Sequence, residues 1–267
     1  MSLIENNTLN LRHLTESGKP KVMISGKLIN RKLNINLIYL FFLFGIMSVS
    51  GVSQSPEIIN MEEIPQRKVR KYIVSRHIDK MSDFSSIKAS CKREGIDSDF
   101  HMHQKEFNLE YDLMNVWDGY SNIDPGITWG KQSLQFGLMI SKCTNSVVYV
   151  RNASHAAVDT GQVYFLNLKL LNGLFNIAVA FEVINVDQNM HLVEFSYIDN
   201  NKAKGKQIIE FYDNGNGSTR IVHRSYFKSE SSFRDNLLYP LFHKKFIREF
   251  HKNMEKIIKK ANPVITV

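Results

Sequence analysis

The amino-acid sequence predicts an α+β fold in which a curved antiparallel β-sheet wraps around a long C-terminal α-helix, with a short helix after the first strand. Three observations lead to this prediction. Apolar runs of strand length succeed one another from residue 134 to residue 227, separated by turn residues rather than by helices. The last part of the chain changes to helical periodicity. A short helix-like segment follows the first predicted strand.

The predicted domain covers residues 101–262. Its first strand is expected at Gln104–Tyr111. Leu113–Asp124 follows, with apolar residues at the separations of a helix, and the Pro/Gly turn DPGITWG ends that segment. We therefore expect a strand, a short helix and a turn before the main part of the sheet.

The segment before this domain, residues 54–100, alternates charged residues with short apolar pieces. This pattern predicts a linker-like N-terminal extension. Within it we expect a strand at Val69–Val74 and a short helix near Phe84–Lys92.

The middle of the chain has the spacing of antiparallel hairpins. Turn sequences such as VDQN, DNNKAKG and DNGNGS separate its apolar runs. The strands are expected at 134–141, 146–151, 161–170, 175–186, 191–198, 206–212 and 219–227. These connections are too short for crossover helices, so the pattern excludes alternating βαβ units.

From Tyr239 the period becomes three to four residues, which predicts a long amphipathic helix that begins beside Pro240. Its apolar stripe consists of Phe242, Phe246, Ile247, Phe250, Met254, Ile257 and Ile258. We expect this stripe to pack against the sheet. The opposite face is basic, which is compatible with a peripheral membrane contact as well as with an ordinary solvated surface.

Near the N-terminus, the stretch RKLNINLIYLFFLFGIMSVSGVSQS contains a continuous apolar run over Leu37–Met47. At 11 residues this run is short for a membrane span, which needs about 20. With basic residues before it and small residues after it, the run predicts a secretory signal within residues 1–53, and Met23 offers an alternative start. The alternative is an uncleaved anchor through residues 33–52. We thus expect the protein to be exported, either to the periplasm or by secretion, or to be anchored in a membrane.

Composition limits the other possibilities. The chain has 267 residues, 43% of them hydrophobic, which is enough for one domain with a full core. The net charge is +8, but outside residues 1–53 there are 28 basic and 24 acidic residues, an ordinary balance that gives no indication of a nucleic-acid partner. Cys91 and Cys143 have no second cysteine at metal-ligand spacing, and whether they pair is left open.

The order of these elements resembles the START-like helix-grip superfamily, which includes polyketide cyclases, dehydrases and lipid-transport-like proteins. The stretch EFNLEYDLMNVWDGYSNIDPGITWG resembles the opening strand and helix of that family, including its V-W pair at Val116 and Trp117. Residues 181–227 look like its paired strands, and the last 30 residues look like its C-terminal helix. The resemblance implies a cavity between sheet and helix that takes a lipid or another apolar small molecule.

Strand alternation predicts which side chains face this cavity, because successive residues of a strand point to opposite faces. In the last strand, Arg220 and Arg224 share the expected outer face, which turns His223 and Ser225 inward among apolar neighbours. Such polar groups must find a partner or a ligand. The ligand-binding side chains that we predict are Trp129, Tyr164, Phe181, Phe195, Tyr197, His223, Ser225, Phe246 and Phe250.

Other chemistry is less well supported by the pattern. His101 and His103 lie on one face of a predicted strand, as a metal pair would, but no third ligand is identifiable, so we expect neither a metal nor a cofactor. Catalytic residues are not assigned. The favoured function is an exported domain that binds or carries an apolar molecule. The alternatives are a cyclase- or dehydrase-like enzyme with His223 as acid or base, and a structural or partner-binding domain without a ligand.

Overall fold

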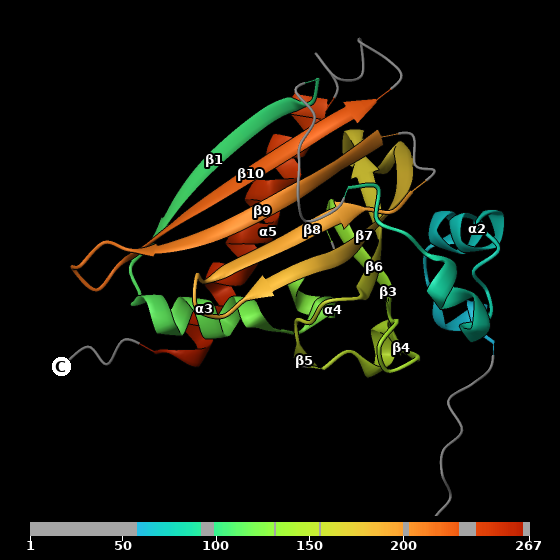
Figure 1. The fold of residues 1–267 in the computed structure, drawn as a ribbon, viewed down its shortest axis with the longest axis horizontal. Coiled ribbons are helices and arrows are strands. Elements are labelled where there is room, and N and C mark those ends of the chain that lie inside the picture. Colours follow the sequence, from blue (N-terminus) through green and yellow to red (C-terminus); the bar gives the residue numbers. More distant parts are fainter. Residues whose placement is uncertain are drawn as a thin grey trace, which may run out of the picture. The chain divides into compact units, whose positions relative to one another are not determined.

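The computed structural model describes residues 58–91, 99–130, 132–154, 156–199, 203–229 and 239–263. The predicted leader at 1–53 lies outside the described residues. Most of the described chain forms one antiparallel sheet of eight strands in the order β1-β10-β9-β8-β7-β6-β3-β4 (Figure 1). The strands are β1 (His101–Leu109), β3 (Leu134–Ser141), β4 (Ser146–Tyr149), β6 (Gln162–Leu170), β7 (Phe175–Asp187), β8 (Leu192–Tyr197), β9 (Ala203–Asp213) and β10 (Thr219–Ser229). A separate small ladder joins β2 (Asn122–Ile123) to β5 (Ala156–Ala157).

The C-terminal helix α5 (Tyr239–Ala261) crosses one face of this sheet, and two short helices, α3 (Leu113–Ser121) and α4 (Pro125–Thr128), follow β1 (Figure 1). Both short helices begin at aspartates whose side chains accept backbone N–H groups, Asp112 from Asn115 and Asp124 from Gly126. The predicted α+β class, with its sheet around a C-terminal helix and its short helix after the first strand, is confirmed. The sheet, the two short helices and α5 together form a helix-grip architecture.

Two irregularities bend the sheet. The register shifts between Phe136 and Leu138 in β3, and between Val183 and Asn185 in β7. Bulges of this kind increase twist and curvature in an antiparallel sheet. Strand β1 contacts α5 through His103 with His243 and through Phe107 with His251. Strands β6 and β7 line a groove together with Phe242 and Phe246 of α5.

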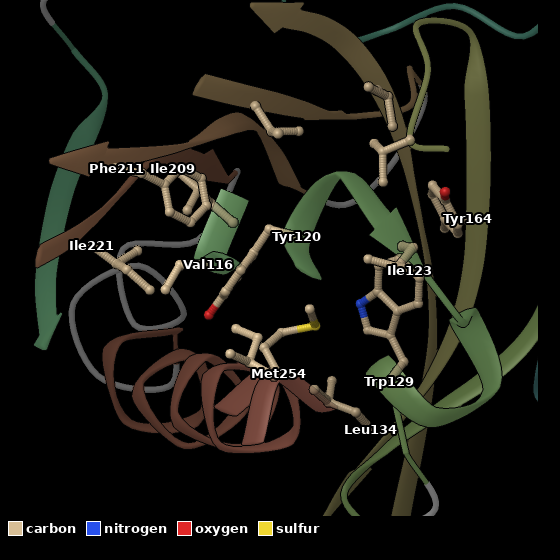
Figure 2. Close-up of a cluster of buried hydrophobic side chains, with 14 of the residues drawn as sticks. Val116, Tyr120, Ile123, Trp129, Leu134, Tyr164, Ile209, Phe211, Ile221 and Met254 are labelled. Atoms are coloured by element: carbon tan, nitrogen blue, oxygen red, sulfur yellow. The ribbon is translucent and has the colours of Figure 1, made fainter. Parts of the chain in front are cut away.

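The inner face of the sheet carries the larger hydrophobic core, which is closed by α3, α4 and α5. Figure 2 shows side chains from the sheet and from the helices meeting there. Tyr120 from α3, Trp129 after α4, and Met254 from α5 are directed toward the same interior. Tyr164, one of the predicted ligand-binding residues, lies in this core, and Phe181 and Phe195 pack against it. The predicted apolar stripe of α5 also faces this core, with Met254 and Ile258 fully buried.

The outer face of β3, β6 and β7 is covered by residues 58–91. This segment contains the 3₁₀ helices η1 (Met61–Glu63) and η2 (Met81–Ser86) and the helix α2 (Arg67–Ser75). It forms a second apolar cluster with the outward-pointing side chains of the sheet. A segment with linker-like composition thus forms a packed layer, while the exact domain boundaries stay a prediction.

The predicted strand at Val69–Val74 is wrong, because this stretch lies within α2. Val69 and Ile73 are four residues apart and so share one helix face, and both are fully buried against the sheet. Burial of that face outweighs the strand preference of the β-branched residues. The helix predicted near Phe84–Lys92 begins earlier, as η2, and ends at Ser86. No helix in the described ranges is both long and apolar enough to cross a membrane.

Candidate functional site

A cavity of about 80 Å³ remains between the inner face of the sheet and α5. It adjoins a wider groove of about 730 Å³, with which it shares Leu168, Tyr197, His243 and Phe246. The groove is bounded by the ends of β6 and β7, by the first turns of α5 and by α2. The inner cavity alone is small, and together with the groove it forms a site that opens between these elements.

The groove lies beside the first residues of β7, which have a neighbouring strand on one side only. Phe181 of β7 pairs with Tyr197, the last residue of β8, and a hydrogen bond from Ile198 N to Ala180 O (3.2 Å) ends the contact. Residues 175–179 pair with β6 on one side, and no described strand pairs with them on the other. The apolar side chains of this half-strand, including Ile177 and Val179, are therefore left as a wall of the groove.

The structure brings most of the predicted ligand-binding residues together. The inner cavity is lined by Trp129, Phe181, Phe195, Tyr197, His223, Phe246 and Phe250. Tyr164 and Ser225 are buried nearby but are not among the lining residues. Tyr164 packs on Trp129 and donates its hydroxyl to Gln162 Oε1 (2.6 Å). A ligand-binding role for these residues stays a prediction.

A chain of buried hydrogen bonds passes through the inner end of the site. Tyr120 Oη lies 2.6 Å from His251 Nδ1, His251 Nε2 lies 2.9 Å from His223 Nδ1, and His223 Nε2 lies 2.9 Å from Gln207 Oε1. The Gln207 oxygen can only accept, so a neutral His223 donates through Nε2 and accepts at Nδ1. His251 must then donate through Nε2, and Tyr120 donates to His251. All three hydrogen bonds therefore point in one direction along the chain.

This direction of the hydrogen bonds holds for neutral histidines, and burial keeps them neutral. Burial lowers the pKa of His251 to about 3. Burial, with the nearby His251 and His103, lowers the pKa of His223 well below its ordinary value. Burial also lowers the pKa of His243 well below its ordinary value, and raises that of the Tyr120 hydroxyl well above its own. At neutral pH the inner end of the site therefore presents polar but uncharged groups.

The sequence indicated His223 but not its partners. His243 and His251 lie on the same helical face as Ile247 and Met254, so a polar residue interrupting that apolar stripe was the available signal. Tyr120 and Gln207 carried no comparable signal, because a tyrosine on an apolar helix face and a glutamine in a strand are common.

The other candidates have structural surroundings. His101 stacks on Phe227, with ring centroids 5.6 Å apart, and His103 meets His243 edge to face at 5.6 Å. Within the described ranges, no group of three or more His, Cys, Asp or Glu side chains is placed to hold a metal ion. Cys91 and Cys143 are not joined to each other by a disulfide.

Comparisons with known proteins add similarity to solved structures only. No family model matches the chain, and no curated protein matches it significantly. Norcoclaurine synthase from Thalictrum flavum is 14% identical, with 64% of this chain and 97% of that one covered and a TM-score of 0.43. The Zhui aromatase/cyclase from Streptomyces sp. R1128 is 6% identical, with 63% and 99% covered and a TM-score of 0.46. A START superfamily protein from Mycobacterium smegmatis is 10% identical, with 61% and 99% covered and a TM-score of 0.42. At these values we take neither ligand nor activity from the similarity.

Proposed function

We propose that this protein binds an apolar small molecule, such as a lipid, in the cavity and groove between the sheet and α5. The observation that carries the proposal is the groove itself. Its volume of about 730 Å³ lies within the range of small-molecule sites, roughly 300 to 1,000 Å³. Leu168, Val179 and Phe246 belong to its apolar wall. Burial of ligand surface against such a wall stabilises a complex by about 25 cal/mol per Å² before the costs of association.

The geometry favours binding over catalysis. A cyclase- or dehydrase-like role for His223 requires a ring nitrogen that exchanges protons with a substrate. Both nitrogens of His223 are already engaged, by His251 and by Gln207. No described residue that lines the inner cavity carries a carboxylate to serve as an acidic partner. The third alternative, an interior filled by its own aromatic residues, describes the small inner cavity but not the groove.

Export is a further part of the proposal, and it rests on the apolar run at Leu37–Met47 with basic residues before it and small residues after it. Fractionation of cells that express the full chain, with N-terminal sequencing of the mature protein, tests it. A new N-terminus close to residue 53 is expected. A full-length chain retained in the membrane fraction would instead support the anchor through residues 33–52.

The binding proposal is tested by solvent extraction and native mass spectrometry of the purified protein from several expression hosts. We expect a co-purifying apolar ligand. Leu168 lines both the cavity and the groove, so Leu168→Trp should fill the site and remove that ligand. Leu174→Trp is the matched control, since Leu174 is 74% exposed in the turn of the same β6–β7 hairpin and lines neither space. Absence of ligand from every host, or equal ligand in the two variants, would contradict the proposal.

A further inference from the structure

One wall of the groove is basic, and the N-terminal extension supplies it. Lys68, Lys71 and Arg76 line the groove from α2 and the residue that follows it. Opposite them are the apolar side chains of β6, β7 and α5. The site thus has a cationic wall beside an apolar one, although the chain outside the predicted leader has an almost balanced charge.

Among the described residues, we find no acidic side chain that compensates this wall. The described residues that line the groove include no aspartate or glutamate. Helix α2 itself, RKVRKYIVS, contains no acidic residue. Lys68 and Lys71 form no ion pair with a described residue, and both are exposed to solvent. The charges at the groove are therefore available to a ligand.

The other cations of α2 differ from these three. Arg70 donates its guanidinium N–H groups to the backbone carbonyls of Ile64 and Pro65, which holds it within the extension. Arg67 is exposed and does not line the groove.

Arg76, by contrast, is one of the three groove cations. It packs its guanidinium over the ring of Tyr72, 5.1 Å from the centroid, and both residues line the groove. That contact orients Arg76 at the groove wall.

We propose that the groove binds a single-chain amphiphile with an anionic head group, a carboxylate or a phosphate, which Lys68, Lys71 and Arg76 contact. This inference rests on the proposed function and specifies the class of ligand. The tail lies along Leu170, Ile177 and Val179, where the inner face of β7 has no described strand beside it, and points toward the inner cavity. The uncharged inner end of the site suits a tail rather than a second charged group.

The physical case is one of complementarity. A guanidinium and two ammonium groups form charge-assisted hydrogen bonds with carboxylate or phosphate oxygens. Because these side chains stand at an open rim, water and salt screen them, and each contact contributes modestly. Selectivity for an anion over a neutral head group should therefore be moderate in size and should decrease as the ionic strength rises.

The test is isothermal titration calorimetry of the protein, freed of bound ligand, with four probes that share a ten-carbon tail. These are decyl phosphate, decanoate, decanol and decyltrimethylammonium. We expect the two anions to bind about tenfold more tightly than decanol at low salt, with decyltrimethylammonium the weakest. The ratio of decyl phosphate to decanoate affinity distinguishes a phosphate from a carboxylate head group.

Variants locate the selectivity. The triple variant Lys68→Gln, Lys71→Gln and Arg76→Gln should lose most of the preference for anions while binding decanol within about twofold of the original protein. The control triple, Arg67→Gln, Lys88→Gln and Lys256→Gln, removes equal charge from exposed residues that do not line the groove. It should keep the preference. Circular dichroism of both confirms that the fold is retained.

The outcomes separate the two proposals. Equal binding of decanol and the anions by the original protein, or equal behaviour of the two triple variants, would overturn the head-group inference and leave the proposed function standing. Failure of all four probes to bind, with no effect of Leu168→Trp on any co-purifying ligand, would overturn both.

Discussion

The two faces of the sheet solve the same packing problem in different ways. Strand β6 presents Val163 and Phe165 outward and Tyr164 and Leu166 inward, and all four are buried. On the outer face, the short extension follows the sheet closely and leaves these side chains without exposure. On the inner face, α3, α4 and α5 close the core, and unfilled space remains between α5 and the curved sheet. The outer face therefore contributes mainly stability, and the inner face provides room for a ligand.

Polar groups follow the same division. On the outward side of the sheet, two buried carboxylates form ion pairs, Glu182 with Lys142 (2.5 Å) and Glu194 with Lys206 (3.0 Å). The inner face instead holds the uncharged chain through Tyr120. A neutral hydrogen-bonded network avoids the large cost of desolvating charges next to an apolar cavity. The contrast explains why histidines, and not carboxylates, accompany the cavity.

The largest expected effect compares one phenylalanine from each face. Phe165→Ala removes a fully buried ring from the outer cluster and should lower the free energy of unfolding by about 4 kcal/mol. Phe195 is only half-buried and lines a cavity that already exists. Phe195→Ala should therefore lower the free energy of unfolding by less than half as much as Phe165→Ala. Urea unfolding of both variants measures the difference. Equal losses would show that the inner face is packed as tightly as the outer one.

Acid should weaken the inner face selectively. His223, His243 and His251 have folded-state pKa values below their ordinary value of 6.5. Below pH 6.5 the unfolded chain therefore binds more protons than the folded one, and stability falls as the pH falls from 6.5 toward the folded pKa, which for His251 is about 3. Each histidine should contribute about 1 kcal/mol of loss between pH 7 and pH 5.5.

Thermal unfolding across this pH range measures the effect. The other groups near these histidines are His103, with Lys105 and Lys244 close to it, and Tyr120, which Glu255 faces. His251→Gln should reduce the pH-dependent loss by about one third, and His77→Gln, at an exposed position of the extension, should not change it. A stability that stays constant from pH 7 to pH 5.5 would contradict the buried, neutral state of the three histidines.

Two glycines sharpen the comparison further. A Cβ at Gly137 would lie 2.9 Å from Val69 Cγ1 and 3.0 Å from the Phe165 carbonyl oxygen on the outer face. A Cβ at Gly119 would lie 2.6 Å from Ile258 Cγ1, where α3 meets α5. The Ile258 side chain can move away from a new Cβ more easily than the Phe165 carbonyl can, because the carbonyl belongs to a strand. In addition, alanine favours the helical conformation over glycine by about 1 kcal/mol, which partly offsets the loss at Gly119. We expect a loss of about 2 kcal/mol for Gly137→Ala and about 1 kcal/mol for Gly119→Ala by urea unfolding, and the reverse order would contradict this account.

The smallest effect belongs to an exposed ion pair. Arg151 Nη1 lies 3.2 Å from Glu63 Oε1, and the Arg151 side chain is 76% exposed. Solvent screening and side-chain entropy leave such pairs with roughly 0 to 1 kcal/mol. Glu63→Gln should therefore change the free energy of unfolding by less than about 0.5 kcal/mol. A larger loss in the same urea assay would show that the rim of the extension matters more than its apolar packing.

Local patterns in the sequence determined the strands, the long C-terminal helix and the inward set of each strand. This was possible because strand and helix periods are properties of the backbone, so that Tyr164 and Leu166, or Phe195 and Tyr197, must share a face wherever the strand is placed. The turn sequences between runs determined that neighbouring strands pair as hairpins. His223 was found in the same way, as a polar residue on an apolar face.

Tertiary structure alone decided the rest. That Val69 and Ile73 form a helix depends on the outer face of β6, about 90 residues further along the chain, which buries them. Tyr120 and His251 are 131 positions apart, and only the crossing of α3 and α5 brings their side chains together. The groove exists because β8 ends at Tyr197 while β7 continues, and its basic wall exists because α2 docks there. These features depend on contacts between residues distant in sequence, which no local period encodes.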